Sequence, residues 1–243
     1  MSCIAFIPAR SGSSRIPHKN VCNFFGHPLI AYSINQAIHT GIFSEVVVIT
    51  DSPDYADIAQ SYGASVPDLR PSSTARNRST DCEWLEWILN LNSTYQSSKF
   101  FSILRPTSPF RSVESIVNAF NTLDSSKFDS IRAVEPVKQH PGKMWRLRGE
   151  QLLPLFPFEF DEPNNVPWHN SSFQSLPNIY IQNASLEICR TISFFKSGII
   201  SGESVMPLFT TSREGFDINY PEDILYAEFM VSSGRWAAPP FID

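Results

Sequence analysis

The sequence predicts a three-layer α/β fold, in which helices cover both faces of a twisted, mostly parallel β-sheet. Apolar runs of strand length alternate along the chain with segments of helical periodicity. The run from Val46 to Thr50 is continuous and β-branched, which is typical of a parallel strand covered on both faces. The 243 residues are 42% hydrophobic and 18% charged, as expected of a globular protein with a sizeable core. These three observations together predict the fold class.

The first elements follow the order strand, loop, helix, strand, helix. Cys3 to Pro8 is a short apolar run that ends at a polar loop, as expected of a buried strand. Pro28 to Thr40 has apolar residues at helical spacing and begins with proline. After the strand at 46–50, Pro53 to Tyr62 is predicted to form a helix that stops at Gly63. This order is characteristic of layered α/β domains.

The alternation continues through the rest of the chain. The predicted helices are Asp81–Leu91, Ser112–Leu123 with Ser112 as its N-cap, and Tyr220–Ser232 with acids in its first turn. The predicted strands are Phe100–Leu104, Ser130–Val137, Asn178–Ile188 with an interruption around Asn183 and Ala184, and Val205–Thr210. Residues 139–177 are Pro-rich and aromatic without a clear period, and are interpreted as a β-rich insertion or a long functional loop.

Charge and composition exclude several classes of protein. A net charge of −5 argues against nucleic-acid binding, which usually requires a basic face. No apolar run is long enough to span a bilayer, so no membrane partner is expected. The first residues lack the charged segment and cleavage site of a signal peptide. The four cysteines have no CxxC spacing, which favours a cytoplasmic protein with small buried cysteines over a catalytic thiol.

Positive charge is concentrated in the loop that follows the first strand. Arg10, Arg15 and Lys19 lie there together, whereas residues 1–9 and 21–69 contain no lysine or arginine and 21–69 contain five acids. Ligands of open α/β sheets sit at the carboxyl ends of the strands, where this loop begins. Its serines and Gly12 allow close approach of an anion. A triphosphate site is therefore preferred over a solvated loop with incidental charge, and neither a Walker A nor a GxGxxG motif is present at this loop.

The loop from Ala9 to Asn20 resembles the opening motif of the acylneuraminate cytidylyltransferases, the CMP-sialic, CMP-legionaminic and CMP-pseudaminic acid synthetases. Further segments resemble family motifs in the right order: Val48–Ser52, Leu69–Pro71, Leu104–Arg111, His140–Pro141 with Lys143, Gln182–Ile188 and Phe216–Asp223. The resemblance implies a nucleotide-diphospho-sugar transferase-like fold in a single domain, residues 1–243. It also implies that 139–177 is a dimerisation or acceptor-side insertion, so that the protein is a homodimer.

The implied reaction transfers CMP from CTP to an acidic, nonulosonic-type sugar with release of pyrophosphate. By resemblance, the catalytic residues are Arg10, Lys19 and Asp217, and Mg²⁺ is held by Asp217 and Asn219. The nucleotide-binding residues implied are Ala9, Arg10, Ser11, Gly12, Ser13, Arg15, Lys19, Asn20, Arg70 and Ser79. The sugar-binding residues implied are Arg105, Thr107, Ser108, His140, Asn183 and Ala184.

Several positions depart from the family pattern. Asn219 stands where the family often has a second aspartate, Arg105 where sialic acid enzymes usually have glutamine, Phe173 where they carry an arginine, and Asn77 where an aspartate is common. The nucleotide loop is therefore well matched and the acceptor pocket is altered. Two alternatives stay open: a nucleotidyltransferase that uses another NTP and a sugar phosphate, and a non-catalytic nucleotide-sugar-binding paralogue.

Some candidate residues have a structural interpretation beside the functional one. Thr107 and Ser108 are as well explained as turn-formers. His140 is interpreted as a structural or a sugar-binding residue, and Asp51 as a helix cap or a nucleotide contact, with some preference for the site. Trp84, with Trp87 at helical spacing, is expected in the core or an interface.

Overall fold

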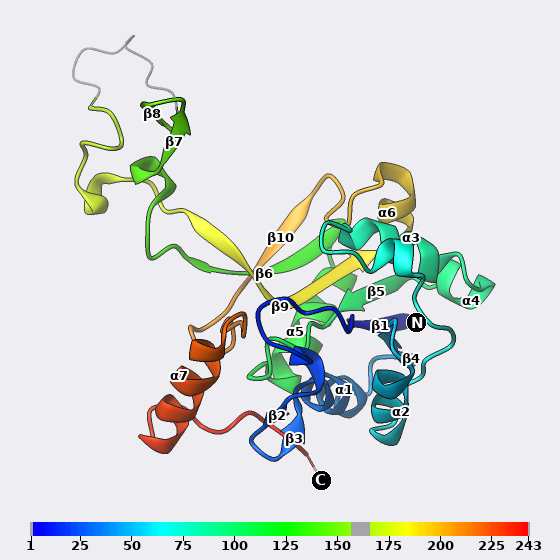
Figure 1. The fold of residues 1–243 in the computed structure, drawn as a ribbon. Helices are drawn as coiled ribbons and strands as arrows, with labels where there is room; N and C mark the ends of the chain where they lie inside the picture. Colours follow the sequence, from blue (N-terminus) through cyan, green and yellow to red (C-terminus); the bar gives the residue numbers. More distant parts are fainter. Residues whose placement is uncertain (1, 157–165, 243) are drawn as a thin grey trace. The chain divides into compact units, whose positions relative to one another are not determined.

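A computed structural model of the chain describes residues 2–156 and 166–242. The chain divides into two compact units, one formed by Met1–Val134 with Gln182–Asp243 and the other by Glu135–Ile181 (Figure 1). Each unit is described by itself. None of the helices in the described parts of the chain has the length and apolar character needed to cross a membrane.

The larger unit contains a six-stranded sheet in the order β10-β6-β9-β5-β1-β4. Its strands are β1 (Cys3–Pro8), β4 (Glu45–Ile49), β5 (Phe100–Ile103), β6 (Ser130–Pro136), β9 (Tyr180–Arg190) and β10 (Val205–Phe209). β1 pairs in parallel with β4 and β5, β10 pairs in parallel with β6, and β9 runs antiparallel to β5. The predicted mostly parallel sheet is confirmed.

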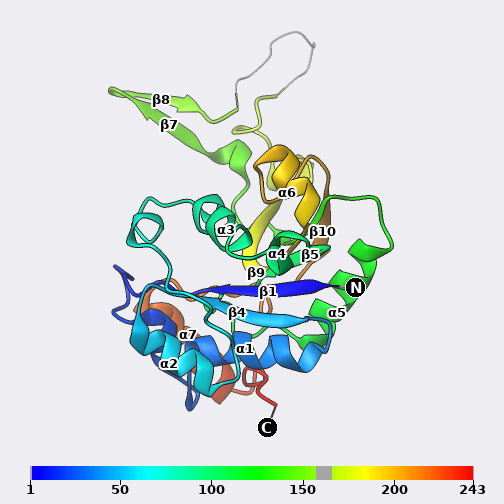
Figure 2. The same cartoon turned by 90° about the vertical axis from the view of Figure 1, so that its right-hand side faces the viewer.

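Helices cover both faces of this sheet (Figure 2). They are α1 (Leu29–Thr40), α2 (Pro53–Ser61), α3 (Asp81–Leu89), α4 (Ser93–Gln96), α5 (Val113–Asp124), α6 (Thr191–Ser197) and α7 (Pro221–Ser232). Alternate residues of β1 belong to two separate apolar clusters: Ala5 packs with side chains of α1 and α5, whereas Phe6 packs with Trp84 of α3. Because successive side chains of a strand point to opposite faces, an unbroken apolar run is what a doubly covered strand requires.

The predicted elements agree with the observed ones at most boundaries to within two residues, with one correction. β9 is continuous from Tyr180 to Arg190, so the expected interruption around Asn183 and Ala184 is wrong. Asn183 stays in the strand because both ends of its amide are bonded. Its Oδ1 accepts from the Ser185 amide at 3.1 Å, and its Nδ2 donates to Thr210 Oγ1 at 2.8 Å. The short helices α4 and α6 and the two-residue strands β2 (Asn23–Phe24) and β3 (His27–Pro28) were not predicted.

The tryptophan and cysteine predictions have mixed outcomes. Trp84 is buried in the core, and Trp87 packs partly buried against the same cluster, as expected. All four cysteines are free, and Cys3 and Cys189 are buried. Cys22 and Cys82 are only half-buried, which corrects the expectation that all four are core residues.

The smaller unit holds an antiparallel hairpin of β7 (Trp145–Arg148) and β8 (Gln151–Pro154). His140 is buried in it, accepts from the Gly142 amide through Nδ1 at 3.0 Å, and thereby leaves Nε2 to donate to the Pro177 carbonyl at 3.1 Å. The expected insertion at 139–177 falls within this unit, although its residues 157–165 lie outside the described ones.

Asp129 closes the turn before β10, and we expect its removal to weaken the fold in a pH-dependent way. Hydrogen bonds from the Ser193 hydroxyl and from the amide and hydroxyl of Ser204 lower the pKa of Asp129 to about 2. A lowered pKa means that the folded state favours the carboxylate. Its contribution is therefore complete above the unfolded value of about 3.9 and disappears as the pH falls through about 2.

Asp129→Asn should accordingly lower the melting temperature at pH 7 by a few degrees, with a smaller deficit below pH 4. Melting curves of the two proteins between pH 2 and 7 test this. A deficit that is constant across that range would contradict the assignment.

Candidate active site

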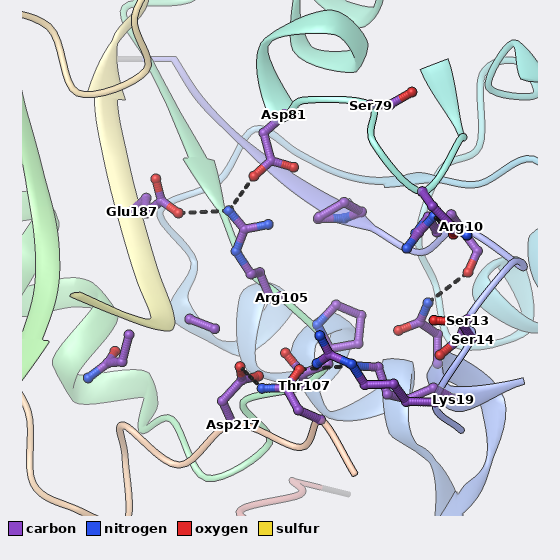
Figure 3. Close-up of a pocket in the computed structure, with 18 of the residues that line it drawn as sticks. Arg10, Ser13, Ser14, Lys19, Ser79, Asp81, Arg105, Thr107, Glu187 and Asp217 are labelled. Carbon is purple, nitrogen blue, oxygen red and sulfur yellow. Dashed lines mark hydrogen bonds and ion pairs between the residues drawn. The ribbon is translucent and has the colours of Figure 1, made fainter. Parts of the chain in front are cut away.

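A pocket of about 710 Å³ opens beyond the carboxyl ends of β1 and β5 (Figure 3). One side is formed by the loop after β1, and the opposite side by β9 and the residues that follow β5. In open α/β sheets, ligand sites occupy this edge because the strand ends leave room between diverging loops. The parallel pairing of β1 with β5 therefore places the pocket where the fold favours binding.

The loop after β1 is held by partly buried polar contacts at both ends. Asp51, which follows β4, accepts from the Ser11 amide at 2.7 Å and from its hydroxyl at 3.0 Å. The buried Asn20 donates through Nδ2 to the Arg10 carbonyl at 3.0 Å. Asp51 thus stabilises the loop conformation and does not line the pocket, which corrects the preference for a nucleotide contact.

Lys19 joins this loop to the segment before α7. Its Nζ donates to the Ile218 carbonyl at 2.9 Å and lies 3.5 Å from Asn219 Oδ1. Burial lowers the pKa of Lys19, and Asp217 acts against this shift. The ammonium therefore enters the pocket from a partly desolvated position, where its interaction with an anion is strengthened.

Two further cations of the pocket contact the segment that precedes α3. Arg10 Nη1 donates to Asn77 Oδ1 at 2.9 Å, and Arg70 is buried with Nε on Thr74 Oγ1 at 3.1 Å. Burial lowers the pKa of Arg70, which nevertheless keeps its charge at neutral pH. The partners of both guanidinium groups are neutral.

The cations on this side of the pocket form no salt bridge with a carboxylate among the described residues. Among the described residues, the salt bridges involve Lys99, Arg105 and Arg132 only, and none of the cations on the nucleotide side. Those cations are Arg10, Arg15, Lys19, Arg70 and Arg76. In a protein of net charge −5, such a cluster is suited to an anion with several charges.

The opposite wall of the pocket is electrically compensated. Arg105 Nη2 lies 2.7 Å from Asp81 Oδ2 and 2.9 Å from Glu187 Oε1. Dashed lines mark both ion pairs in Figure 3. Burial alone would lower the pKa of Arg105, but the two carboxylates raise it above the usual value. The pKa of Asp81 is lowered: burial opposes the shift, and the charge and hydrogen bond of Arg105 outweigh it.

The segment before α7 carries one carboxylate with a free oxygen. Asp217 Oδ2 accepts from Asn219 Nδ2 at 2.5 Å, whereas the buried Oδ1 has no hydrogen-bond partner among the described residues. Asp223 caps α7 by accepting from the amides of Asn219 and Tyr220, both at 2.7 Å, as predicted for the acids of this turn. A buried carboxylate oxygen without a partner is costly unless a ligand completes it.

The structure brings most of the predicted site residues to one pocket. The predicted residues that line it are Arg10, Ser13, Arg15, Lys19, Asn20, Arg70, Ser79, Arg105, Thr107, Asn183, Ala184, Asp217 and Asn219. Ala9 and Ser108 are buried, and Ser11, Gly12 and His140 are also absent from the lining. Ser108 Oγ has no partner among the described residues, so its predicted sugar contact is not supported by its placement.

Sequence reasoning missed several lining residues, notably Asp81, Gln182 and Glu187. The sequence did contain a signal for Glu187. This acid lies in the buried part of an apolar strand, and a buried charge requires a partner.

An α/β sheet with a cation-rich loop at the end of its first strand, facing a charge-compensated wall across one pocket, is typical of transferases that bind a polyanionic substrate beside a second one. Residues 4–147 match the family model described as cytidylyltransferase, and the chain belongs to this family.

Relatives and solved structures agree with this assignment. The chain is 33% identical to the CMP-N,N′-diacetyllegionaminic acid synthase of Legionella pneumophila, over 98% of this chain and 99% of that enzyme. It is 34% identical to an N-acylneuraminate cytidylyltransferase of Escherichia coli over 74% of this chain, but spans only 42% of that protein. A solved CMP:2-keto-3-deoxy-manno-octonic acid synthetase complexed with CTP has the same fold, with a TM-score of 0.65 at 15% identity, covering 96% of this chain and 100% of that one.

Proposed function

We propose that this protein transfers CMP from CTP to an acidic sugar of the nonulosonic type and releases pyrophosphate. The carrying observation is a single pocket in which unpaired cations on one side face a polar, charge-compensated wall on the other. Relatives that bear the names of sialic, legionaminic and pseudaminic acid enzymes support the choice of CTP and of the acceptor class.

In this proposal the cations bind the triphosphate and the wall binds the sugar. The sugar hydroxyl oxygen forms a bond to the α-phosphorus of CTP, the bond from that phosphorus to the bridging oxygen breaks, and the hydroxyl proton passes to solvent. Arg10 and Lys19 neutralise the charge that develops on the phosphate oxygens. The reaction needs no covalent enzyme intermediate, because positioning and charge stabilisation suffice for it.

Asp217 is proposed to bind Mg²⁺. The buried Oδ1 without a partner fits a cation, and Mg²⁺ sites in phosphoryl-transfer enzymes commonly use one or two carboxylates together with substrate phosphates. Bound there, the ion would supply charge neutralisation for the departing pyrophosphate. Asn219 has an amide where a second carboxylate could stand. Its amide nitrogen donates to Asp217 and thereby orients the Asp217 carboxylate.

Asn219→Asp is expected to tighten binding of the divalent cation by about tenfold, because a second carboxylate adds charge beside Asp217. Binding of Mn²⁺ measured by electron paramagnetic resonance, and the Mg²⁺ concentration that half-saturates pyrophosphate release, both report this change. Asp217→Asn should abolish Mn²⁺ binding, so that the signal of the free ion stays at full intensity. Equal Mn²⁺ affinity in all three proteins would rule out a metal site here.

The proposed activity is tested by pyrophosphate release from each of the four NTPs with a panel of acids. The panel contains N-acetylneuraminic, N,N′-diacetyllegionaminic, pseudaminic and 2-keto-3-deoxy-manno-octonic acid, and a sugar 1-phosphate serves as the competing acceptor. We expect release only with CTP and one or more of the acids. Release with another NTP and the sugar phosphate would favour the first alternative function, and binding of CTP without any release would favour the non-catalytic one.

The proposal includes a homodimeric, cytoplasmic enzyme. The smaller unit exposes apolar side chains on its hairpin, among them Leu147, which is 72% exposed, and Leu152, which is 59% exposed. Exposed apolar residues of this size are typical of surfaces that associate. The free cysteines suit a reducing compartment. Sedimentation analysis of the full chain tests the dimer.

A further inference from the structure

Arg132 lies on β6, does not line the pocket, and contacts two residues that do. Its Nη2 lies 2.5 Å from Glu187 Oε2, and its Nη1 donates to Gln182 Oε1. Gln182 and Glu187 both belong to β9, and β6 neighbours β9 in the sheet. One guanidinium thus holds two side chains of the pocket wall at once.

The contact with Arg132 decides which end of the Gln182 amide is free. Arginine carries only hydrogen-bond donors, so the amide oxygen of Gln182 must face it. The remaining polar group of this pocket residue is the amide NH₂, because the contact with Arg132 is the only side-chain hydrogen bond of Gln182 among the described residues. Arg132 therefore turns Gln182 into a hydrogen-bond donor.

The contact with Glu187 has a parallel effect on Arg105. Glu187 uses Oε2 for Arg132 and Oε1 for Arg105, whose Nη2 it shares with Asp81 (Figure 3). The four charged groups cancel, and both carboxylates hold the Nη2 end of the Arg105 guanidinium. Both side-chain contacts of Arg105 use Nη2, so among the described residues Nε and Nη1 have no acceptor and remain available as donors.

We propose that Arg132 is a positioning residue for the acceptor wall: by holding the side-chain oxygens of Gln182 and Glu187, it makes this wall a set of donors that selects substrates through carboxylate or acyl oxygen atoms. The inference rests on the proposed function and adds to it the chemistry by which the second substrate is selected. In this proposal Asp81 and Glu187 hold Arg105 in place, and the substrate binds to the Nε and Nη1 atoms of Arg105.

The test compares KM for the acid with KM for CTP in four variants, using whichever acid of the panel the wild-type protein accepts. Arg132→Met should raise KM for the acid by about tenfold and leave KM for CTP within about twofold. Arg132→Lys, which keeps the charge but not the two-pronged contact, should fall between. Lys196→Met on the exposed face of α6 is the control cation and should change neither constant.

The fourth variant, Gln182→Glu, separates the positioning of the pocket wall from an effect on the stability of the protein. Glutamate keeps an oxygen for Arg132 but replaces the free NH₂ by a charged oxygen, so KM for the acid should rise at least as much as in Arg132→Met. A double-mutant cycle adds the single variant Gln182→Met and the double variant Arg132→Met, Gln182→Met. Because Arg132 acts through Gln182, the rise in KM for the acid in the double variant should be less than the product of the rises in Arg132→Met and Gln182→Met.

The outcomes distinguish the two proposals. Two results overturn the positioning role alone, provided that the wild-type protein turns over. The first is an unchanged KM for the acid in Gln182→Glu and in folded Arg132→Met. The second is an equal rise in these variants of the KM for the acid and the KM for CTP. Absence of turnover by the wild-type protein with every acid overturns the proposed function, and this inference with it.

Discussion

Lys19→Met is expected to reduce kcat/KM for pyrophosphate release by about 1000-fold, within the range seen when one preorganised donor to a developing oxyanion is removed. The ammonium is partly buried, faces the pocket and is fixed by the Ile218 carbonyl at 2.9 Å, so little reorganisation is needed when charge develops. Lys19→Arg should retain part of the rate, since the charge stays and its geometry changes.

The control for this variant is Lys196→Met, which removes a lysine from α6 and should leave the rate within about twofold. Initial rates measured over a range of CTP concentrations at saturating acid give kcat/KM and so measure the effect. A loss of less than tenfold in a variant that still binds CTP would show that Lys19 does not stabilise the transferred group.

The ionisation of Lys19 adds a pH-dependent expectation. Burial lowers the pKa of Lys19, so the ammonium loses its proton, and activity declines, at a pH below the ordinary value of 10.5. Asp217 raises this pKa. Asp217→Asn should therefore move the alkaline limb of its residual activity to lower pH, and a limb that moves to higher pH would contradict the assignment.

Arg111→Met is expected to lower the free energy of unfolding by about 3 kcal/mol, which corresponds to about 6–12 °C in Tm for a chain of this size. Arg111 is completely buried, and burial lowers its pKa to about 9. Its guanidinium donates to the Ser185 carbonyl, to Gln36 Oε1 at 3.0 Å and to the Arg105 carbonyl at 3.2 Å. All of these acceptors are neutral.

The loss follows from what the substitution leaves behind. Methionine removes the donors but not the buried acceptors on α1, β9 and the turn after β5, and each acceptor left without a partner costs about 1–3 kcal/mol. Arg111→Lys should recover part of this stability. Arg148→Met, at an exposed position of β7, should change the free energy by less than about 0.5 kcal/mol.

Thermal melting and urea unfolding of the three variants measure these differences. A melting temperature of Arg111→Met equal to that of the wild type would mean that the turn after β5 does not depend on this side chain.

The fold and the nucleotide loop were predictable because both depend on neighbouring residues. The apolar run at Cys3–Pro8 and the β-branched run at 46–50 indicate buried strands by composition alone, and the cations between Arg10 and Lys19 follow the first strand directly. Asn183 misled the prediction because its polar amide is satisfied by Thr210, a residue of another segment. His140 was left between two roles for the same reason: its partner Pro177 is distant in sequence.

The acceptor wall shows most clearly where sequence reasoning ends. Arg105 was predicted as a sugar contact, and its placement in the pocket is consistent with that. Its pairing with Asp81 and Glu187, however, joins residues 24 and 82 positions apart in the chain, and Lys19 meets Ile218 across 199 positions.

The sequence by itself determined the layered α/β fold and a multivalent cation loop at the end of its first strand, since periodicity and local charge are properties of adjacent residues. Only the tertiary structure decided which charges remain free. The cations of the loop face neutral partners, whereas Arg105 and Arg132 are neutralised by acids from α3 and β9. Coulombic interactions are strong only over a few ångströms, and the register of β5, β6 and β9 sets those distances.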